Sequence, residues 1–266
     1  MSSSKTKVMS ILRPVMGIRK MEVFLKPLDA VSEDVSLFDL STKLFQLEIV
    51  TNGIDRLESV DMTGGCVMVA NHPRGLLDLF ATGAWLSENT TQPVKCMANK
   101  IIEMFIPALK PYLVPVDNMG ARGQGRSSFN REAFEDAKSF LLSGGVLGVC
   151  PAGEVASFRF RSPEGWFRLS DHRWSSSFVG LAFELELPIV PIHVSGRNRM
   201  SYYLLRLFGK VFGRLANFRE LVASRDDNIV ISVGLPLSFE QYKDLAFDDV
   251  ASRVRENLYA ASRGGQ

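Results

Sequence analysis

Residues 66–78 constrain the fold of this chain more than any other stretch, because a short apolar run stops there at a polar turn. The run itself, 66–70, is too short for a helix and predicts a buried strand. Pro73 and Gly75 predict a turn directly after it, and the apolar sequence of 76–88 predicts a packed helix. The stretch therefore predicts a strand, a tight turn and a helix in succession.

His72 and Asp78 stand at the two ends of this predicted turn. On one continuous helix they would point to different faces, because only spacings of three or four residues bring side chains together. With His72 in the loop after the strand and Asp78 in the first turn of the helix, the two side chains can meet. An aspartate at a helix start is favoured by the helix dipole, and it can accept a hydrogen bond from one imidazole nitrogen.

Strands and helices are predicted to alternate along the rest of the chain. The expected strands lie at 45–50, 94–98, 112–116, 146–150, 188–194 and 229–233, and the expected helices at 37–44, 101–109, 132–142, 177–185 and 250–261. The two prolines of 188–194 would suit an edge strand or a bulge. We expect an α/β fold with a largely parallel or mixed sheet covered by helices, and a site at the carboxyl ends of its strands.

Composition points to one domain, which we place at 37–266. The chain has 266 residues, of which 46% are hydrophobic and 23% charged, and this is enough for one substantial core. No Pro/Gly/Ser-rich linker, repeat or low-complexity tract divides it. The three cysteines, at positions 66, 96 and 150, lack metal-site spacing and are odd in number. We therefore expect reduced, buried thiols of a cytosolic protein, with no bound metal or cofactor.

The N-terminal segment, residues 1–36, is expected to form a basic amphipathic helical segment interrupted by Pro14 and Gly17. It either lies at a membrane interface or packs on the domain. No run of about 18 apolar residues would span a bilayer, and no cleavable secretory signal is recognisable. Membrane contact is therefore expected to be peripheral, on the cytoplasmic face.

A second basic segment, residues 197–225, has Glu220 as its only acidic residue. Apolar residues recur there every three or four positions from Met200 to Leu215, which predicts a basic amphipathic helix. Such a helix either contacts a membrane or an acidic carrier protein, or packs its apolar stripe on the sheet. Both basic segments suit an anionic surface, and no nucleic-acid partner is expected.

Three blocks of the sequence resemble the glycerolipid and lysophospholipid acyltransferases, the 1-acylglycerol-phosphate acyltransferase-like family. Asn71-His72-Pro73 through Asp78 is similar to their histidine–aspartate box, with five residues instead of the common four between His and Asp. This longer spacing resembles the hemolysin-like bacterial branch, which includes O-acyltransferases of aminolipid synthesis. Residues 149–156 are similar to that branch's Phe-Pro-Ala-Gly-Glu-Val-Ser block, and 188–198 to its Pro-Val-x-Pro strand ending in Gly-Arg-Asn. The order of the blocks agrees from about residue 45 to 240.

The resemblance implies transfer of a fatty acyl group from acyl carrier protein or coenzyme A to a lysolipid hydroxyl, with His72 as general base oriented by Asp78. It assigns substrate binding to nine residues: Asn71, Pro73, Arg74, Gly75, Pro151, Gly153, Glu154, Arg159 and Arg197. The arginine with which common members hold an acceptor phosphate is replaced by Val155. Either Arg159, Arg161 or Arg197 supplies that charge, or the acceptor is a phosphate-free lyso-aminolipid such as lyso-ornithine lipid.

The chemistry can also be argued from the residues. An alcohol is a poor nucleophile at neutral pH, and a base that removes its proton contributes about 10²–10⁴-fold. No Gly-x-Ser-x-Gly elbow is present, so we expect direct transfer without an acyl-enzyme. Backbone N–H groups around Gly75 or at 151–153 are expected to stabilise the oxyanion. A hydrolase and a non-enzymatic membrane-binding protein are the alternatives from other classes.

Three further residues with reactive side chains are not assigned to the site, and a fourth, Glu154, has two possible roles. Cys150, at the end of a predicted buried strand, is expected to be a core residue rather than a nucleophile. His172 lies in a polar run and is expected to be solvated, and His193, on a strand, to be structural. Glu154 either binds an acceptor amine or hydroxyl, or only bonds its own loop.

Overall fold

The computed structural model describes residues 23–30, 37–117, 124–162, 165–207, 209–223 and 228–263. Most of the predicted N-terminal segment, 1–36, therefore lies outside the described residues. Its described part includes a short 3₁₀ helix, η1 (Lys26–Ala30), and places Leu25 and Leu28 in the hydrophobic core. No helix within the described ranges is long and apolar enough to cross a bilayer.

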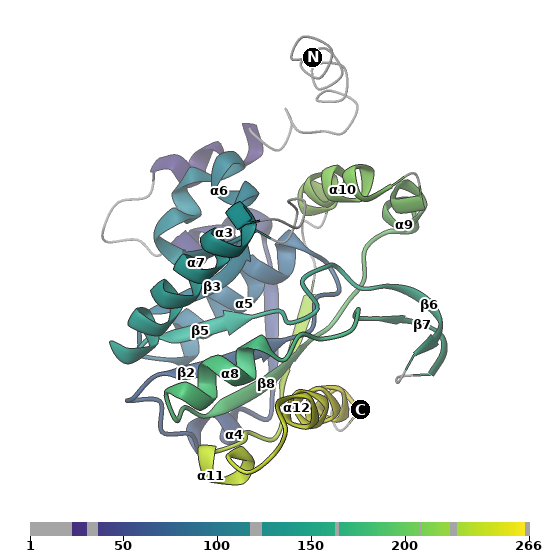
Figure 1. Cartoon of the computed structure of the whole chain (residues 1–266). Coiled ribbons are helices and arrows are strands. Elements are labelled where there is room, and N and C mark those ends of the chain that lie inside the picture. The colour runs from purple at the N-terminus through teal and green to yellow at the C-terminus, as the bar shows by residue number, and fades with distance from the viewer. Residues whose placement is uncertain are drawn as a thin grey trace.

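A seven-stranded sheet forms the centre of the molecule (Figure 1). In spatial order its strands are β1 (Glu48–Asn52), β9 (Asn228–Val233), β8 (Ile189–Val194), β2 (Cys66–Ala70), β5 (Val146–Val149), β3 (Val94–Asn99) and β4 (Leu113–Val116). The five strands from β8 to β4 are mutually parallel, whereas β9 runs antiparallel to β8 and parallel to β1. The predicted α/β class with a largely parallel mixed sheet is confirmed.

Helices cover both faces of the sheet, as the side chains of β2 require. Cys66, Met68 and Ala70 point into one core cluster, and Val67 and Val69 point into the other. The first cluster is closed by α3 (Leu37–Phe45), α5 (Leu76–Asn89), α6 (Ile101–Phe105) and the 3₁₀ helix η2 (Pro107–Tyr112). The second is closed by α7 (Gln124–Leu142), α8 (Ser177–Glu184) and α12 (Phe247–Ala261). A strand buried on both faces reads as a continuous apolar run, which is how β2 appears in the sequence.

Close packing fixes the position of α5, which begins beside the site. A Cβ at Gly83 would lie 2.2 Å from the ring of Phe38 in α3, so only glycine allows the two helices to approach this closely. On the same helix, Trp85 Nε1 donates a hydrogen bond of 2.8 Å to Thr51 Oγ1 of β1. Helix α5 is therefore held from both sides.

Smaller elements complete the chain: α4 (Ile54–Glu58), the hairpin β6 (Ser157–Ser162) and β7 (Gly165–Ser170), α9 (Met200–Leu207), α10 (Lys210–Ala223) and α11 (Phe239–Tyr242). The hairpin was not predicted from the sequence. The single amphipathic helix expected at 200–215 is two helices, because the chain turns at Gly209, whose φ of 122° is a glycine conformation.

Several predicted elements differ from the observed ones; the helix expected at 132–142, for instance, begins earlier, at Gln124. The strand expected at 45–50 begins later, at Glu48, because α3 continues to Phe45. The helix expected at 101–109 ends at Phe105, since the following Pro107 opens a 3₁₀ helix instead. Strand β8 is not an edge strand but lies between β9 and β2. Its Pro191 falls just before the three residues that pair with β9, so the missing N–H breaks no bond of that ladder.

Candidate active site

The carboxyl ends of β2, β5 and β8 lie side by side, because β2 pairs in parallel with both neighbours. The loops that follow these strands, 71–75, 150–156 and 195–198, therefore meet at one edge of the sheet (Figure 1). These loops carry the three sequence blocks singled out above. The site is thus located at the predicted end of the sheet.

Asn71 joins two of these strand ends through its side chain. Its amide Nδ2 donates to the Val194 carbonyl at 2.9 Å, and its Oδ1 accepts from the Val194 N–H at 2.7 Å. The side chain is buried, and both polar atoms of its carboxamide are used. Asn71 therefore extends the pairing of β2 and β8 by one side chain, and its assignment to substrate binding stays a prediction.

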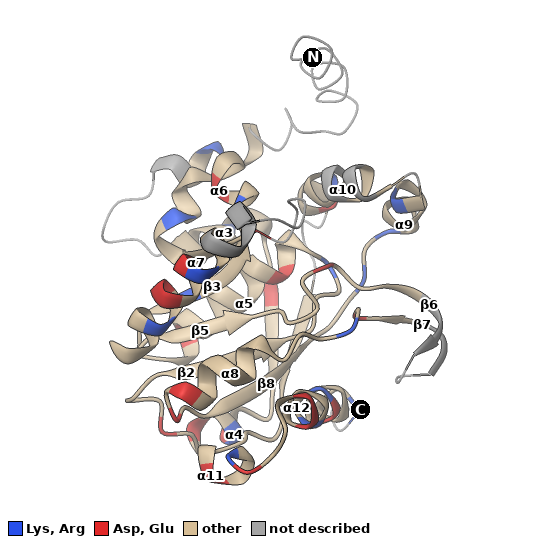
Figure 2. Cartoon of the chain, in the orientation of Figure 1, with Lys and Arg blue, Asp and Glu red and all other residues tan. Residues whose placement is uncertain are grey.

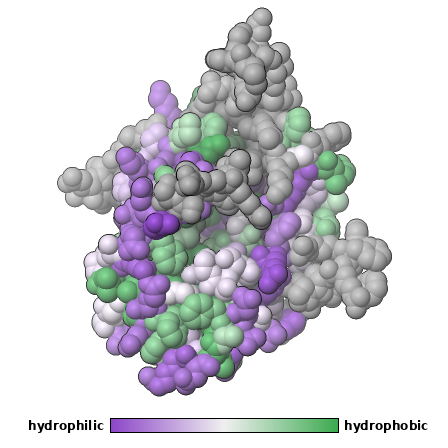
Figure 3. Space-filling view, in the orientation of Figure 1, coloured by the Kyte–Doolittle hydropathy of each residue, from purple (hydrophilic) through white to green (hydrophobic). Residues whose placement is uncertain are grey.

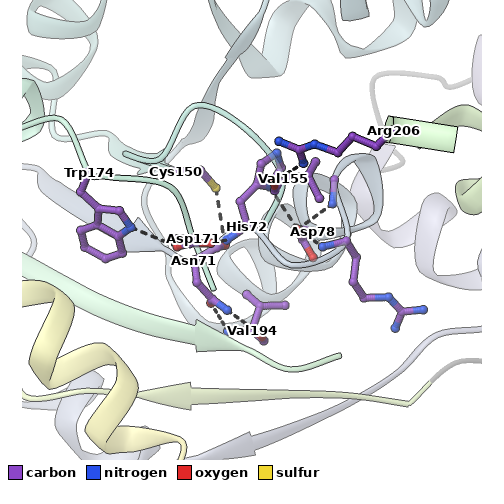
Figure 4. Close-up of polar contacts among 11 residues, drawn as sticks. Asn71, His72, Asp78, Cys150, Val155, Asp171, Trp174, Val194 and Arg206 are labelled. Carbon is purple, nitrogen blue, oxygen red and sulfur yellow. Dashed lines mark hydrogen bonds and ion pairs between the residues drawn. The ribbon is translucent and has the colours of Figure 1, made fainter. Parts of the chain in front are cut away.

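His72 and Asp78 meet as the strand–turn–helix prediction requires (Figure 4). Nδ1 of His72 lies 3.1 Å from Oδ2 of Asp78, which is 1% exposed at the third position of α5. The same oxygen accepts the backbone N–H groups of Arg74 at 2.8 Å and Gly75 at 2.9 Å. Gly75 has a φ of 82°, and a Cβ there would lie 2.7 Å from Asn217 Oδ1, so the turn requires glycine.

Asp171 is a further residue of the site that sequence reasoning missed. Its carboxylate is fully buried; Oδ1 accepts the backbone N–H of His72 at 3.1 Å, and Oδ2 accepts Nε1 of Trp174 at 3.0 Å. Burial raises its pKa, although both hydrogen bonds oppose the rise. On the opposite side, the carbonyl of His72 accepts the N–H of Ala156 at 2.7 Å. The peptide groups of His72 are thus held by two other segments.

The imidazole of His72 is 22% exposed and its pKa lies well above the ordinary histidine range. Burial by itself lowers this pKa, but negative charge on the neighbouring Cys150 sulfur and on the Asp78 carboxylate favours the imidazolium more strongly. Cys150 is half-buried and its Sγ lies 3.8 Å from the Asn71 carbonyl (Figure 4). It packs against the first core cluster, as expected of a core residue, but it is half-buried rather than buried and borders the histidine.

The loop after β5 is bound to helix α9 through Arg206. Nη2 of Arg206 lies 3.1 Å from Glu154 Oε2 and 2.8 Å from His172 Nε2, while Nη1 donates to the Val155 carbonyl at 2.6 Å. Glu154 therefore bonds a neighbouring helix instead of only its own loop. His172, expected to be solvated, takes part in the same cluster. Arg206 was missed because its place in a basic run favoured an exposed position.

Two backbone amides expected to bind an oxyanion are already used. The N–H of Gly75 donates to Asp78, and the N–H of Gly153 donates to the carbonyl of Cys150 at 3.0 Å. Gly153 lies in a turn with a φ of 62°, and Pro151 is buried with its carbonyl accepting from Ser175 at 3.1 Å. These two glycines therefore shape the turns of the site with their N–H groups bonded within the protein, and oxyanion binding by another N–H of these turns stays a prediction.

The other predicted binding residues lie around this centre. Pro73 and Arg74 are buried, and the side chain of Arg74 covers Gly196 at the end of β8. Arg197 is exposed, and the side chain of Arg159 lies outside the described residues.

Neither His193 nor a metal cluster adds to the centre. The ring of His193 packs on Tyr259 at 5.8 Å, and burial lowers its pKa to about 4, so it is neutral. Among the described residues, no group of three or more His, Cys, Asp or Glu side chains is arranged to hold a metal ion.

Two relatives of known activity are similar to this chain over most of its length. The lyso-glycine lipid O-acyltransferase of Phocaeicola vulgatus is 23% identical over 243 residues, covering 88% of this chain and 80% of the relative. The lyso-glycine lipid O-acyltransferase of Bacteroides thetaiotaomicron is 23% identical over 244 residues, covering 88% of this chain and 82% of the relative. The chain thus resembles these two O-acyltransferases over 88% of its length.

A solved structure is also similar: the 1-acyl-sn-glycerophosphate acyltransferase PlsC of Thermotoga maritima. It is 14% identical with a TM-score of 0.49, and the match covers 99% of this chain and 96% of that one. No family model matches the chain.

Proposed function

We propose that this chain is an O-acyltransferase that moves a fatty acyl group from a thioester to a hydroxyl of a lysolipid. The observation that carries the proposal is the His72–Asp78 pair, 3.1 Å apart where three parallel strands end. The similarity of 88% of the chain to two lyso-glycine lipid O-acyltransferases supports it independently.

In this mechanism His72 is the general base. Its Nδ1 faces Asp78, which favours the tautomer with the proton on Nδ1 and leaves Nε2 to accept the proton of the acceptor hydroxyl. The hydroxyl oxygen attacks the thioester carbonyl, the new C–O bond forms and the C–S bond breaks. The proton on Nε2 then passes to the leaving thiolate. Asp78 stabilises the imidazolium in between.

The donor in this proposal is the thioester of coenzyme A or of acyl carrier protein, and the acceptor is a phosphate-free lyso-aminolipid. The acceptor follows from two observations. A buried Val155 stands where a phosphate-binding arginine would be expected from the resemblance. Both relatives are named for a glycine lipid, an acceptor built on an amino acid. We propose that the enzyme acts at the membrane surface, on the cytoplasmic face, where it can meet a lysolipid in the bilayer.

The test gives the purified protein a donor with a radiolabelled acyl group, carried as a thioester on coenzyme A or on acyl carrier protein. Three acceptors are compared: lyso-glycine lipid, lyso-ornithine lipid and lysophosphatidic acid. Label is expected in an aminolipid product. Label only in the acylated product of lysophosphatidic acid would overturn the acceptor assignment. Release of labelled free fatty acid in place of transfer would identify a hydrolase. Binding of lipid with no turnover would identify a non-enzymatic membrane protein.

His72→Ala is the decisive variant, with His193→Gln as its matched control. Loss of the base is expected to lower kcat by about 10²–10⁴-fold, while His193→Gln, which changes a neutral ring packed on Tyr259, keeps most of the activity. Circular dichroism checks that both variants fold. Wild-type kcat in folded His72→Ala would contradict the mechanism.

A further inference from the structure

Helix α9 carries its apolar stripe on the outside of the molecule. Met200, Leu204 and Leu207 are spaced four and three residues apart, so they share one face of the helix. Their side chains are 57%, 57% and 81% exposed. Isolated exposed leucines are ordinary, but a contiguous apolar helix face in solvent marks an interaction surface.

The opposite face of α9 holds the helix in this orientation. Tyr202 and Tyr203 are buried there, in a small core cluster with Val155 and Ala216. Arg206 also points inward, to the loop after β5. Because the aromatic and charged contacts fix the inner face, the exposure of the leucines is a property of the fold.

The described residues of 195–223, which include α9 and its neighbours in the chain, carry exposed positive charge and no exposed negative charge. Arg197, Arg199 and Arg219 are exposed, whereas Glu220 is buried and accepts the N–H of Arg199 at 3.0 Å. Figure 2 shows Lys and Arg positions in α9 and in the chain that leads into it. Arginines beside an apolar helix face match the phosphates and the acyl boundary of an anionic bilayer.

Helix α10 contacts both α9 and α6. Helices α9 and α10 pack together, and the centroid of the buried Phe218 ring in α10 lies 4.7 Å from that of Phe105 in α6. The residue before Phe105 in α6, Met104, is 78% exposed. Figure 3 shows hydrophobic side chains at both ends of this row of helices, on the same end of the molecule.

We propose that the outer face of α9, together with the exposed Met104 of α6, is the surface with which this protein docks on an anionic lipid bilayer. The inference rests on the proposed function and deepens it, since it names the face that meets the lipid source. Leu204 and Leu207 enter the boundary of the acyl chains while the neighbouring arginines contact phosphates. Arg206 on the same helix binds Glu154, in the loop whose Ala156 donates to the carbonyl of His72, so docking through α9 brings the candidate site to the membrane surface.

Cosedimentation of the full chain with vesicles tests the proposal. Vesicles of phosphatidylcholine with phosphatidylglycerol are expected to bind the protein, and pure phosphatidylcholine vesicles to bind it more weakly. Leu207→Asp is expected to lower the partition coefficient by about tenfold or more, as the loss of one buried leucine implies. The matched control Leu235→Asp, at a leucine 59% exposed outside this face, is expected to bind as the wild type does. Arg219→Glu should weaken binding only to the anionic vesicles.

Activity separates this proposal from the proposed function. Leu207→Asp is expected to keep wild-type turnover on a short-chain, monomeric lysolipid and to lose turnover on lysolipid presented in anionic vesicles. Vesicle binding by a wild type without any turnover would overturn the proposed function and leave the docking face intact. Unchanged vesicle binding in Leu207→Asp overturns the docking face. The docking face is also overturned if Leu207→Asp changes the oligomeric state measured by light scattering, which would identify a second copy of the chain as the partner. It is likewise overturned if Leu207→Asp loses only the binding of acyl carrier protein, which would identify that protein as the partner.

Discussion

The carboxylate of Asp171 accepts the backbone N–H of His72 at 3.1 Å, although 99 residues separate the two along the chain. The second carboxylate oxygen accepts the indole N–H of Trp174, and the N–H of Ala156 donates to the carbonyl of His72. The backbone of the candidate base is therefore fixed by residues of two later segments. A base held in this way needs little reorganisation before proton transfer.

Asp171→Asn is expected to lower both stability and kcat. An amide offers one acceptor oxygen and turns an N–H group towards the second donor, so one buried hydrogen bond is lost. Leaving a buried donor unsatisfied costs about 1–3 kcal/mol in the free energy of unfolding, and a misplaced base costs up to about 100-fold in rate. Urea unfolding and steady-state kinetics measure the two effects. The fall should appear in kcat with KM little changed.

Trp174→Phe is the control for Asp171→Asn. It removes the indole N–H but leaves the bond between Asp171 and His72 in place. We expect a loss of stability with kcat close to that of the wild type. If Trp174→Phe and Asp171→Asn lowered kcat equally, Asp171 would have a structural role only.

Local patterns were sufficient to predict β2, the turn and α5, because apolar runs and turn residues act over a few positions. The meeting of His72 and Asp78 followed from the same local geometry. Asp171 and Arg206 were not predictable, since each acquires its partners only when distant segments pack together. The polar sequence around Asp171 is typical of a solvated loop, and only the fold buries it.

The pH dependence of kcat/KM is expected to report the raised pKa of His72. The base must be neutral to accept a proton, so activity rises with pH through a pKa above the ordinary histidine range. Asp78→Asn removes a charge that favours the imidazolium, and it should move this rise to lower pH while lowering the plateau. An unshifted pH profile in Asp78→Asn would show that another group titrates.

The raised pKa of His72 also predicts how the free energy of unfolding changes with pH. The protonated imidazole stabilises the folded state below the unfolded pKa of histidine, and this contribution is lost as pH rises through the higher folded pKa. The stability difference between wild type and His72→Gln, measured by urea unfolding, should therefore shrink with rising pH. A difference that grows with pH would contradict the sign of the shift.

Cys150 is expected to be dispensable for chemistry but sensitive to modification. It borders His72 and is half-buried, whereas Cys66 and Cys96 are fully buried, with the pKa of both thiols raised by burial, that of Cys96 to about 12. Iodoacetamide should therefore label Cys150 first, as mass spectrometry can show, and abolish activity by filling the space beside the imidazole. Cys150→Ala should stay active and resist the reagent. An inactive but folded Cys150→Ala would instead favour a thioester acyl-enzyme.

The contacts of Arg206 predict that removing its charge lowers stability more than removing the charge of its partner Glu154. Arg206→Gln loses the ion pair with Glu154 and also the guanidinium donors to the buried Val155 carbonyl and to His172. Glu154→Gln loses the ion pair with Arg206 and a longer contact of 3.9 Å with His172 Nε2, but it leaves the guanidinium donors in place. The pair with Arg206 is partly exposed, so its coupling in a double-mutant cycle should be only about 0.5–1 kcal/mol. Arg206→Gln is therefore expected to destabilise the protein more, measured by urea unfolding, and to lower kcat as the loop beside His72 loosens. Equal losses in the two variants would show that the Val155 carbonyl and His172 find other donors, and that α9 does not hold this loop.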